Sequence, residues 1–203
     1  GTPKGVMVSF AAYTRASVGI SQNTRSRIDQ DAESRMLSYL PLAHSFERSW
    51  VQGAALADGR THLYFAESLD TFLQDLQRAR PTMFISVPRL WLKFQQGVFS
   101  KMAPAKLDRL LSIPLIGRIV ARKVRKGLGL DAVVVAGSGS APIPAELIGW
   151  YRRIGLALYE GYGMTEDSSY SHTSNAQFNA AGYVGVPLPG VQARISAEGE
   201  ILI

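Results

Sequence analysis

A fully apolar run of five residues at 132–136 places the tightest constraint on the fold of this chain. A strand that is apolar at every position has both faces buried, as in a parallel sheet covered by helices on both sides. Other strand-like segments occur at 36–40, 62–65, 82–87 and 156–159, and helix-like segments separate them. This alternation indicates an α/β chain. We therefore expect a layered fold with a predominantly parallel sheet flanked by helices.

Proline, glycine and apolar spacing predict where several helices begin and end. Pro88 and Pro144 are suited to the first turn of a helix, and Gly155 is suited to end one. Ser68 is expected to cap a helix over 69–76. The helix after Pro144 shows apolar residues at helical spacing, which predict its buried face: Leu147, Ile148, Tyr151 and Ile154.

The residue pattern of the chain changes after Ser174. Glycine and proline then punctuate short β-like pieces, at Gly182, Gly185, Pro187, Pro189 and Gly190. We place a boundary near residue 180. Residues 1–180 would form the α/β subdomain of a larger domain, and residues 181–203 would begin a small β-rich subdomain.

Composition excludes several kinds of site. The 203 residues include no cysteine, so disulfides and thiolate metal sites are excluded, and the three histidines show no metal-ligand spacing. No apolar run approaches the roughly 18 residues of a membrane span. The net charge is +6, and much of the excess lies at 118–126. We interpret that stretch as the solvated face of a short helix, with an anionic membrane contact as an alternative. Nucleic acid is disfavoured because no aromatic residues interleave the basic ones.

Two short stretches carry the chemistry. The segment at 160–166 follows an apolar strand and presents an aromatic ring, a hydroxyl and a carboxylate in quick succession, at Tyr162, Thr165 and Glu166. Open α/β sheets bind ligands at the carboxyl ends of their strands. A ring can stack on a base, a hydroxyl can bond an oxyanion, and a carboxylate can hold Mg²⁺. The second stretch, Gly-Thr-Pro-Lys-Gly at 1–5, is typical of the end of a glycine-rich phosphate loop.

Five motifs occur in a fixed order. They are Gly-Thr-Pro-Lys-Gly at 1–5, Leu-Pro-Leu-Ala-His-Ser-Phe-Glu-Arg at 40–48, Gly-Ser-Ala-Pro at 139–142, Tyr-Gly-Met-Thr-Glu at 162–166, and Gly-Val-Pro-Leu-Pro-Gly at 185–190. In this order the chain resembles the adenylate-forming (AMP-binding) superfamily, and most of all its long-chain fatty-acid–CoA ligases. The resemblance covers essentially the whole chain. It implies that ATP and Mg²⁺ activate a fatty acid to an acyl-adenylate, from which CoA, the cosubstrate, displaces AMP.

The resemblance also implies where the nucleotide binds. Thr2 and Lys4 would contact the β- and γ-phosphates, Tyr162 would stack on adenine, and Thr165 would bond the α-phosphate or the substrate carboxylate. Glu166 would bind Mg²⁺. Further residues would line the nucleotide site: Ser140, Ala141, Pro142, Glu160, Gly161, Gly163 and Met164. The structural alternatives are a core tyrosine at 162, a helix cap at 165 and a solvated first-turn acid at 166.

The acyl group would lie near a different set of residues. His44 would sit near the acyl carboxylate at the mouth of the pocket, and a purely structural histidine is an equal alternative. Gly137 and Gly139 would let the acyl chain pass close to the backbone. We interpret Trp50 as a core residue rather than as part of the wall of the acyl tunnel. Thr165, Glu166 and His44 are the residues expected to take part in catalysis.

We expect this chain to be the central section of a longer, cytoplasmic ligase and to be inactive alone, because family motifs for the ribose hydroxyls and the catalytic lysine are missing from it. Peripheral attachment to a membrane and a homodimer are left open. Two other functions are also left open. One is an adenylate-forming enzyme for an aryl or amino acid, and the other is a non-catalytic nucleotide-binding module.

Overall fold

The computed structural model describes residues 5–28 and 32–203. Its helices are α1 (Phe10–Arg25), the π-helix η1 (Glu47–Gly53), α2 (Ala54–Asp58), α3 (Phe72–Ala79), α4 (Pro88–Phe99), α5 (Pro104–Leu111), α6 (Ile116–Gly127) and α7 (Ala145–Arg153). Its strands are β1 (Ser34–Ser38), β2 (Thr61–Phe65), β3 (Met83–Ser86), β4 (Val135–Ser138), β5 (Leu158–Tyr162), β6 (His172–Thr173), β7 (Val186–Pro187), β8 (Arg194–Ile195) and β9 (Ile201–Leu202).

The central sheet has the order β3-β4-β5-β6-β7. Strands β3, β4 and β5 run parallel, and β6 and β7 add on as antiparallel strands. The parallel pair β1 and β2 lies beside β3, where the Thr82 N–H donates to the Arg35 carbonyl at 2.9 Å. The fold is therefore mixed α/β with a predominantly parallel sheet, as the alternation of segments predicts.

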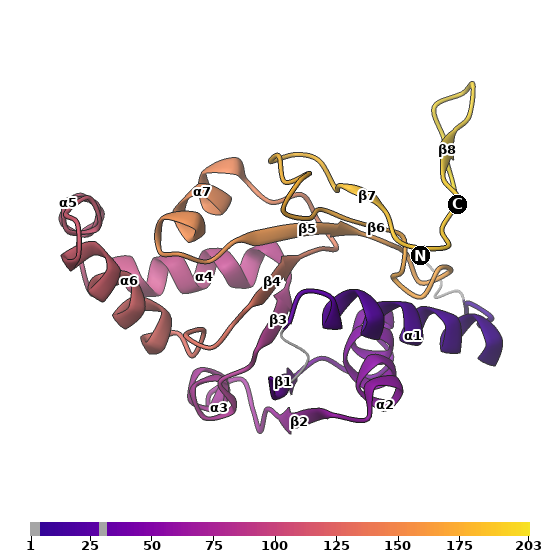
Figure 1. Cartoon of the computed structure of the whole chain (residues 1–203), viewed down its shortest axis with the longest axis horizontal. Coiled ribbons are helices and arrows are strands. Elements are labelled where there is room, and N and C mark those ends of the chain that lie inside the picture. Colours follow the sequence, from indigo (N-terminus) through magenta and orange to yellow (C-terminus); the bar gives the residue numbers. More distant parts are fainter. Residues whose placement is uncertain (1–4, 29–31) are drawn as a thin grey trace.

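Helices cover both faces of the parallel strands (Figure 1). On one face, Phe84, Ala136 and Leu158 belong to a large apolar core that also includes residues of α3, α4, α6 and α7. On the other face, Met83 and Val135 pack with a smaller cluster that includes Val51 of η1. Because side chains alternate along a strand, the even-numbered positions of β3, β4 and β5 face the large core and their odd-numbered positions face α1 and η1.

The helix after Pro144 packs as expected. All four residues of its predicted buried face, Leu147, Ile148, Tyr151 and Ile154, are buried. Pro144 itself is the N-cap, so the helix begins one residue later. Pro88 is the first residue of α4, and Gly155 follows α7 with a φ of 78°. Local helix signals were therefore sufficient here.

The expected helix over 69–76 was placed too early. Helix α3 begins at Phe72 with Thr71 as its N-cap residue, and Leu69 is 94% exposed. The reason is local: the Ser68 and Thr71 hydroxyls lie 3.0 Å apart, and Thr71 donates to Asp75 at 2.7 Å. These bonds form a turn of their own ahead of the helix, in place of a cap at Ser68.

Two strands also begin and end later than their apolar runs. The N–H groups of Val134 and Val135 both donate to the Thr82 carbonyl, at 2.8 and 3.1 Å. Regular pairing therefore starts only at Val135, and Val134 is 57% exposed. Strand β4 therefore runs from Val135 to Ser138 and includes Gly137. The apolar run ends at Tyr159, but strand β5 continues through Gly161 to Tyr162.

The segment beyond residue 180 is in two parts. Strand β7 still belongs to the central sheet, and the Gly182 N–H donates to the Glu160 carboxylate at 3.1 Å. Strands β8 and β9 form a separate antiparallel hairpin. The domain boundary near residue 180 stays a prediction. Within the described residues, no helix is long and apolar enough to cross a membrane.

Candidate functional site

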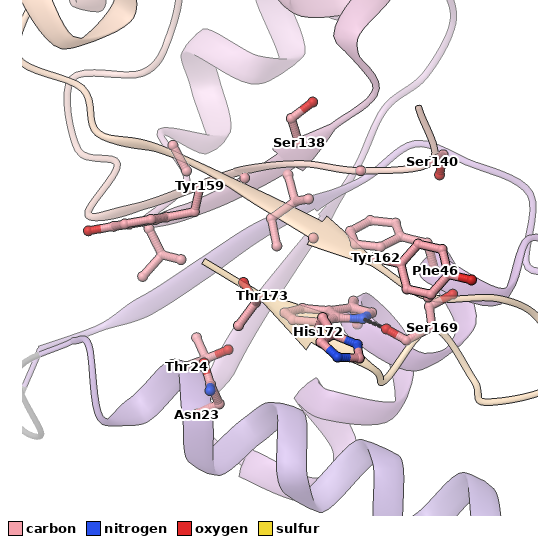
Figure 2. Close-up of a pocket in the computed structure, with 18 of the residues that line it drawn as sticks. Asn23, Thr24, Phe46, Ser138, Ser140, Tyr159, Tyr162, Ser169, His172 and Thr173 are labelled. Atoms are coloured by element: carbon pink, nitrogen blue, oxygen red, sulfur yellow. Dashed lines mark hydrogen bonds between the residues drawn. The ribbon is translucent and has the colours of Figure 1, made fainter. Parts of the chain in front are cut away.

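A pocket lies on the α1 and η1 side of the sheet, at the carboxyl ends of β4 and β5 (Figure 2). Figure 2 shows Tyr159 at one end of it and Phe46 with Tyr162 at the other. The residues that line it come from α1, η1, four strands and the loops beside them: Asn23, Thr24, Arg27, Phe46, Trp50, Ile85, Val135, Ala136, Gly137, Ser138, Gly139, Ser140, Tyr159, Gly161, Tyr162, Gly163, Ser169, His172 and Thr173. We call this the main pocket.

The strand periodicity explains why the sheet is hollow here. The odd-numbered positions Gly137 and Gly161 face this side, and neither carries a side chain that would fill the space. A Cβ added at Gly137 would lie 3.0 Å from the Ile85 side chain. A Cβ added at Gly139 would lie 3.3 Å from the Gly161 carbonyl oxygen. The floor of the main pocket is therefore bare backbone at the places where glycine was expected to allow it.

Two aromatic rings close the pocket from the helical side. Phe46 and Trp50 stack with ring centroids 6.0 Å apart, and the Trp50 indole N–H donates to the Ser169 carbonyl at 2.8 Å. The interpretation of Trp50 as a core residue is corrected, because its side chain lines the pocket. The spacing of Phe46 and Trp50 was the sequence feature that could have indicated this role. It predicts that the two rings share a helix face, but not which cavity that face covers.

The end of the pocket near Tyr159 is more polar. Asn23, Thr24 and Arg27, all close to the C-terminal end of α1, line it. The Arg27 guanidinium lies 5.2 Å from the centre of the Tyr159 ring, and burial lowers the pKa of Arg27. Among the described residues Arg27 forms no ion pair. No carboxylate from the described part of the chain lines the pocket.

A tight turn follows β5 and carries Thr165 and Glu166. Asp167 holds it together: one carboxylate oxygen accepts from the N–H groups of Met164 at 2.9 Å and Tyr170 at 3.2 Å. Burial raises the pKa of Asp167 above its ordinary value. A Cβ at Gly163 would come within 2.7 Å of the Ser169 backbone, so only glycine fits there. Sequence reasoning missed Asp167, although Asp side chains commonly accept hydrogen bonds from nearby backbone N–H groups in turns.

A second cleft adjoins the main pocket. Its lining includes Val6, Arg48, Thr165 and Ser168. The hydroxyls of Ser45 and Ser169 meet at 2.8 Å between the cleft and the pocket. The residue that follows the 1–5 motif thus shares a cleft with Thr165, although the two are far apart in sequence. Thr2 and Lys4 themselves lie outside the described residues.

Only some of the predicted nucleotide residues line the main pocket. Ser140, Gly161, Tyr162 and Gly163 line the main pocket. Ala141 and Pro142 are exposed in the loop after β4, and Met164 is half-buried in the turn. Glu160 faces away from the pocket, and its buried carboxylate accepts the Gly182 N–H. The nucleotide roles of all these residues stay predictions.

Of the residues predicted for catalysis, Thr165 lines the second cleft, whereas Glu166 and His44 line neither that cleft nor the main pocket. Glu166 is exposed and makes no hydrogen bond within the described part of the chain, so its carboxylate is available to a cation. No cluster of three metal-ligating side chains occurs there. One carboxylate fits an ion such as Mg²⁺ that takes its other ligands from phosphates and water. His44 is half-buried, and its Nδ1 accepts the Phe46 N–H at 3.2 Å, which gives it a local structural role. Its predicted role at the substrate carboxylate is untested.

Comparison with known proteins places the chain in a family. Residues 1–202 match the family described as AMP-binding enzyme. The chain belongs to the AMP-binding enzymes. Among curated family members, long chain acyl-CoA synthetase 2 of Arabidopsis thaliana is 29% identical over 99% of this chain and 34% of its own length. A long-chain-fatty-acid–CoA ligase of Mycobacterium tuberculosis is 32% identical over 83% of this chain and 32% of its own length. The chain thus spans about a third of the length of these relatives.

Solved structures of AMP-binding enzymes agree with the fold. The A domain of a carboxylic acid reductase from Segniliparus rugosus, in complex with AMP and a co-purified carboxylic acid, has a TM-score of 0.62. It is 30% identical over 81% of this chain and 26% of its own. The o-succinylbenzoate coenzyme A synthetase of Bacillus subtilis, in complex with ATP and magnesium, has a TM-score of 0.68. It is 21% identical over 100% of this chain and 36% of its own, which supports the fold alone.

Proposed function

We propose that this chain is the central, nucleotide- and acyl-binding section of a long-chain fatty-acid–CoA ligase. The observation that carries the proposal is the position of the main pocket. Its glycine floor lies at the carboxyl ends of β4 and β5, and the turn with Thr165 and Glu166 follows β5 directly. An alkyl chain against bare backbone and aromatic rings would bury apolar surface. Its carboxylate would then reach the turn where a nucleotide phosphate is expected.

The reaction has two steps. A carboxylate oxygen of the acid attacks the α-phosphorus of ATP, and pyrophosphate leaves with the electron pair of the broken P–O bond. The sulfur of CoA then attacks the acyl carbon, the thiol loses its proton, and AMP leaves. Both steps develop negative charge on oxygen, which preorganised donors stabilise. Thr165 would donate its hydroxyl to such an oxygen, and Tyr162 would position the adenine ring.

The predicted metal has a restricted part in this scheme. Glu166 would hold Mg²⁺, which would neutralise charge on the phosphates when bound. The family as a whole and the ATP complex of the Bacillus relative support ATP as the nucleotide. CoA as the thiol is supported by the names of the curated relatives, all with partial coverage of their length. A cytoplasmic protein and a homodimer remain proposals on the same resemblance.

The decisive experiment is substrate profiling of the complete enzyme that contains this chain, by acid-dependent pyrophosphate release. We expect release with palmitate that exceeds release with benzoate and with amino acids. A preference for aryl acids would replace the proposed substrate. An amino acid as substrate is disfavoured because no described carboxylate lines the pocket. If no carboxylic acid stimulates release while the protein still binds ATP, the chain is a non-catalytic nucleotide-binding module.

One prediction tests the acyl path directly. Ile85 packs over the position where Gly137 lacks a Cβ, so Ile85→Phe should fill the main pocket at that point. Displacing two methylenes from an apolar site costs about 1.6 kcal/mol, which is roughly 15-fold in affinity. We expect the ratio of kcat/KM for palmitate over octanoate to fall by about that factor. Gly139→Leu should act in the same direction but with some strain, because its Cβ meets the Gly161 carbonyl.

The matched control is Ile85→Leu, which keeps the volume and should keep the chain-length profile. Thermal melting of both variants separates misfolding from a change in selectivity. A folded Ile85→Phe enzyme with the parent's ratio of palmitate to octanoate would place the acyl chain elsewhere.

A further inference from the structure

The net positive charge of the chain comes from one segment. Residues 101–129 contain eight of the 22 basic residues and one of the 16 acidic residues, which gives a net charge of +7. The rest of the chain has fourteen basic and fifteen acidic residues, or a net charge of −1. The single acid, Asp108, is paired with Arg153 at 2.9 Å. Helix α6 itself has no acidic residue. The charge is therefore a local feature of α5 and α6.

The exposed side of α6 is aliphatic at one end and basic along its length. Four aliphatic residues gather where the helix begins, and all are exposed: Ile113, Leu115, Ile116 and Ile119. Leu115 is 70% exposed and Ile119 is 57% exposed. The same helix carries four exposed basic residues, of which Arg118 lies among the aliphatic ones: Arg118, Arg122, Lys123 and Lys126.

The opposite side of α6 is already used. Ala121 is buried in the large apolar core, and Val120 and Val124 pack against that core. The helix is thus fixed in orientation, with its basic and aliphatic residues directed outward. Helices α5 and α6 lie at the end of the molecule opposite the β8–β9 hairpin (Figure 1), and none of their residues lines the main pocket. A flat partner could approach them without obstructing that pocket.

We propose that α6 and the turn at 113–115 form a docking surface for an anionic lipid bilayer. Basic side chains are attracted to anionic headgroups, and aliphatic side chains beside them enter the boundary between headgroups and acyl chains. A nucleic acid would use the cations but would gain nothing from four exposed aliphatic residues, and α6 offers no aromatic ring for stacking. This inference does not depend on the proposed ligase activity.

Cosedimentation of the complete protein with lipid vesicles tests the proposal. We expect binding to vesicles of phosphatidylcholine with about 30% phosphatidylglycerol, which have a negative surface as a cytoplasmic leaflet does, and little binding to pure phosphatidylcholine. The variant with Arg118→Gln, Arg122→Gln and Lys126→Gln should bind about 100-fold more weakly, since each cation near an anionic surface contributes roughly a fivefold factor. High salt should weaken binding by the unaltered protein.

A matched control removes the same charge elsewhere. Arg15, Arg89 and Arg194 are exposed and lie outside this segment, so replacing all three by Gln should leave vesicle binding within about twofold. The pair Leu115→Ser and Ile119→Ser should weaken binding at least tenfold, since it removes the aliphatic anchor. Melting curves verify that each variant is folded.

Three results would overturn the proposal. The first is equal vesicle binding by the α6 triple variant and its matched control. The second is full binding by the Leu115 and Ile119 pair variant, which would leave only a generic cationic surface. The third is an RNA oligonucleotide that binds as tightly as the vesicles and depends on the same three cations, which would make nucleic acid the partner.

Discussion

The Glu166→Ala variant of the complete enzyme should form acyl-adenylate about 10²–10³ times more slowly than the parent, the loss typical of one preorganised charge-stabilising group. Glu166 is exposed on the turn after β5 and makes no hydrogen bond in the described residues, so its removal leaves the turn intact. That turn is held by the hydrogen bonds that Asp167 accepts from the backbone. The stability of the variant should stay within about 0.5 kcal/mol of the parent, as for an ordinary surface change.

The measurement is palmitate-dependent exchange of pyrophosphate into ATP, with Mg²⁺ varied. If Glu166 holds the metal, Glu166→Asp should retain part of the activity and require more Mg²⁺ for it. Glu198→Ala, an exposed glutamate near the C-terminal end, is the matched control and should exchange at the parent's rate. An unchanged exchange rate in Glu166→Ala would exclude the proposed role.

The Trp91→Ala variant should lose about 3–5 kcal/mol of unfolding free energy, as expected for truncation of a buried aromatic residue. Trp91 is 0% exposed and lies edge-on to Tyr151, with ring centroids 4.9 Å apart, and to Phe84, at 5.3 Å. Its indole N–H donates to the Gly137 carbonyl at 3.0 Å. The ring therefore supports both the large core and the strand that floors the main pocket.

Urea unfolding of the complete protein, followed by circular dichroism, measures this loss. Trp91→Phe keeps an aromatic ring but leaves the Gly137 carbonyl without its donor, so it should cost less, about 1–3 kcal/mol. Leu92→Ala is the neighbouring control: Leu92 is exposed, and its truncation should cost far less than that of Trp91. A loss below about 1 kcal/mol for Trp91→Ala would mean that α4 does not support the sheet as described.

Local patterns in the sequence were enough to predict the elements and the family. Apolar runs and helical spacing predicted the α/β alternation and the buried face of α7, because a repeat of two or of 3.6 residues depends only on how one element meets a core. Pro88 and Gly155 marked the ends of their helices for conformational reasons that are equally local. The five ordered motifs predicted the AMP-binding family, which the family match confirms.

Only the tertiary structure decided where the strands begin and which side chains meet. Strand β4 starts at Val135 because a neighbouring carbonyl, that of Thr82, accepts the N–H groups of both Val134 and Val135. The register of strand pairing decides which glycines lie on the side of the sheet that carries the main pocket. That register depends on partner strands, which lie far away in the sequence. Tertiary packing also places the Phe46 and Trp50 rings over the main pocket, and it brings Val6 and Thr165 into one cleft. A sequence specifies the periodicity of each segment by itself, whereas a pocket exists only once several distant segments have packed against one another.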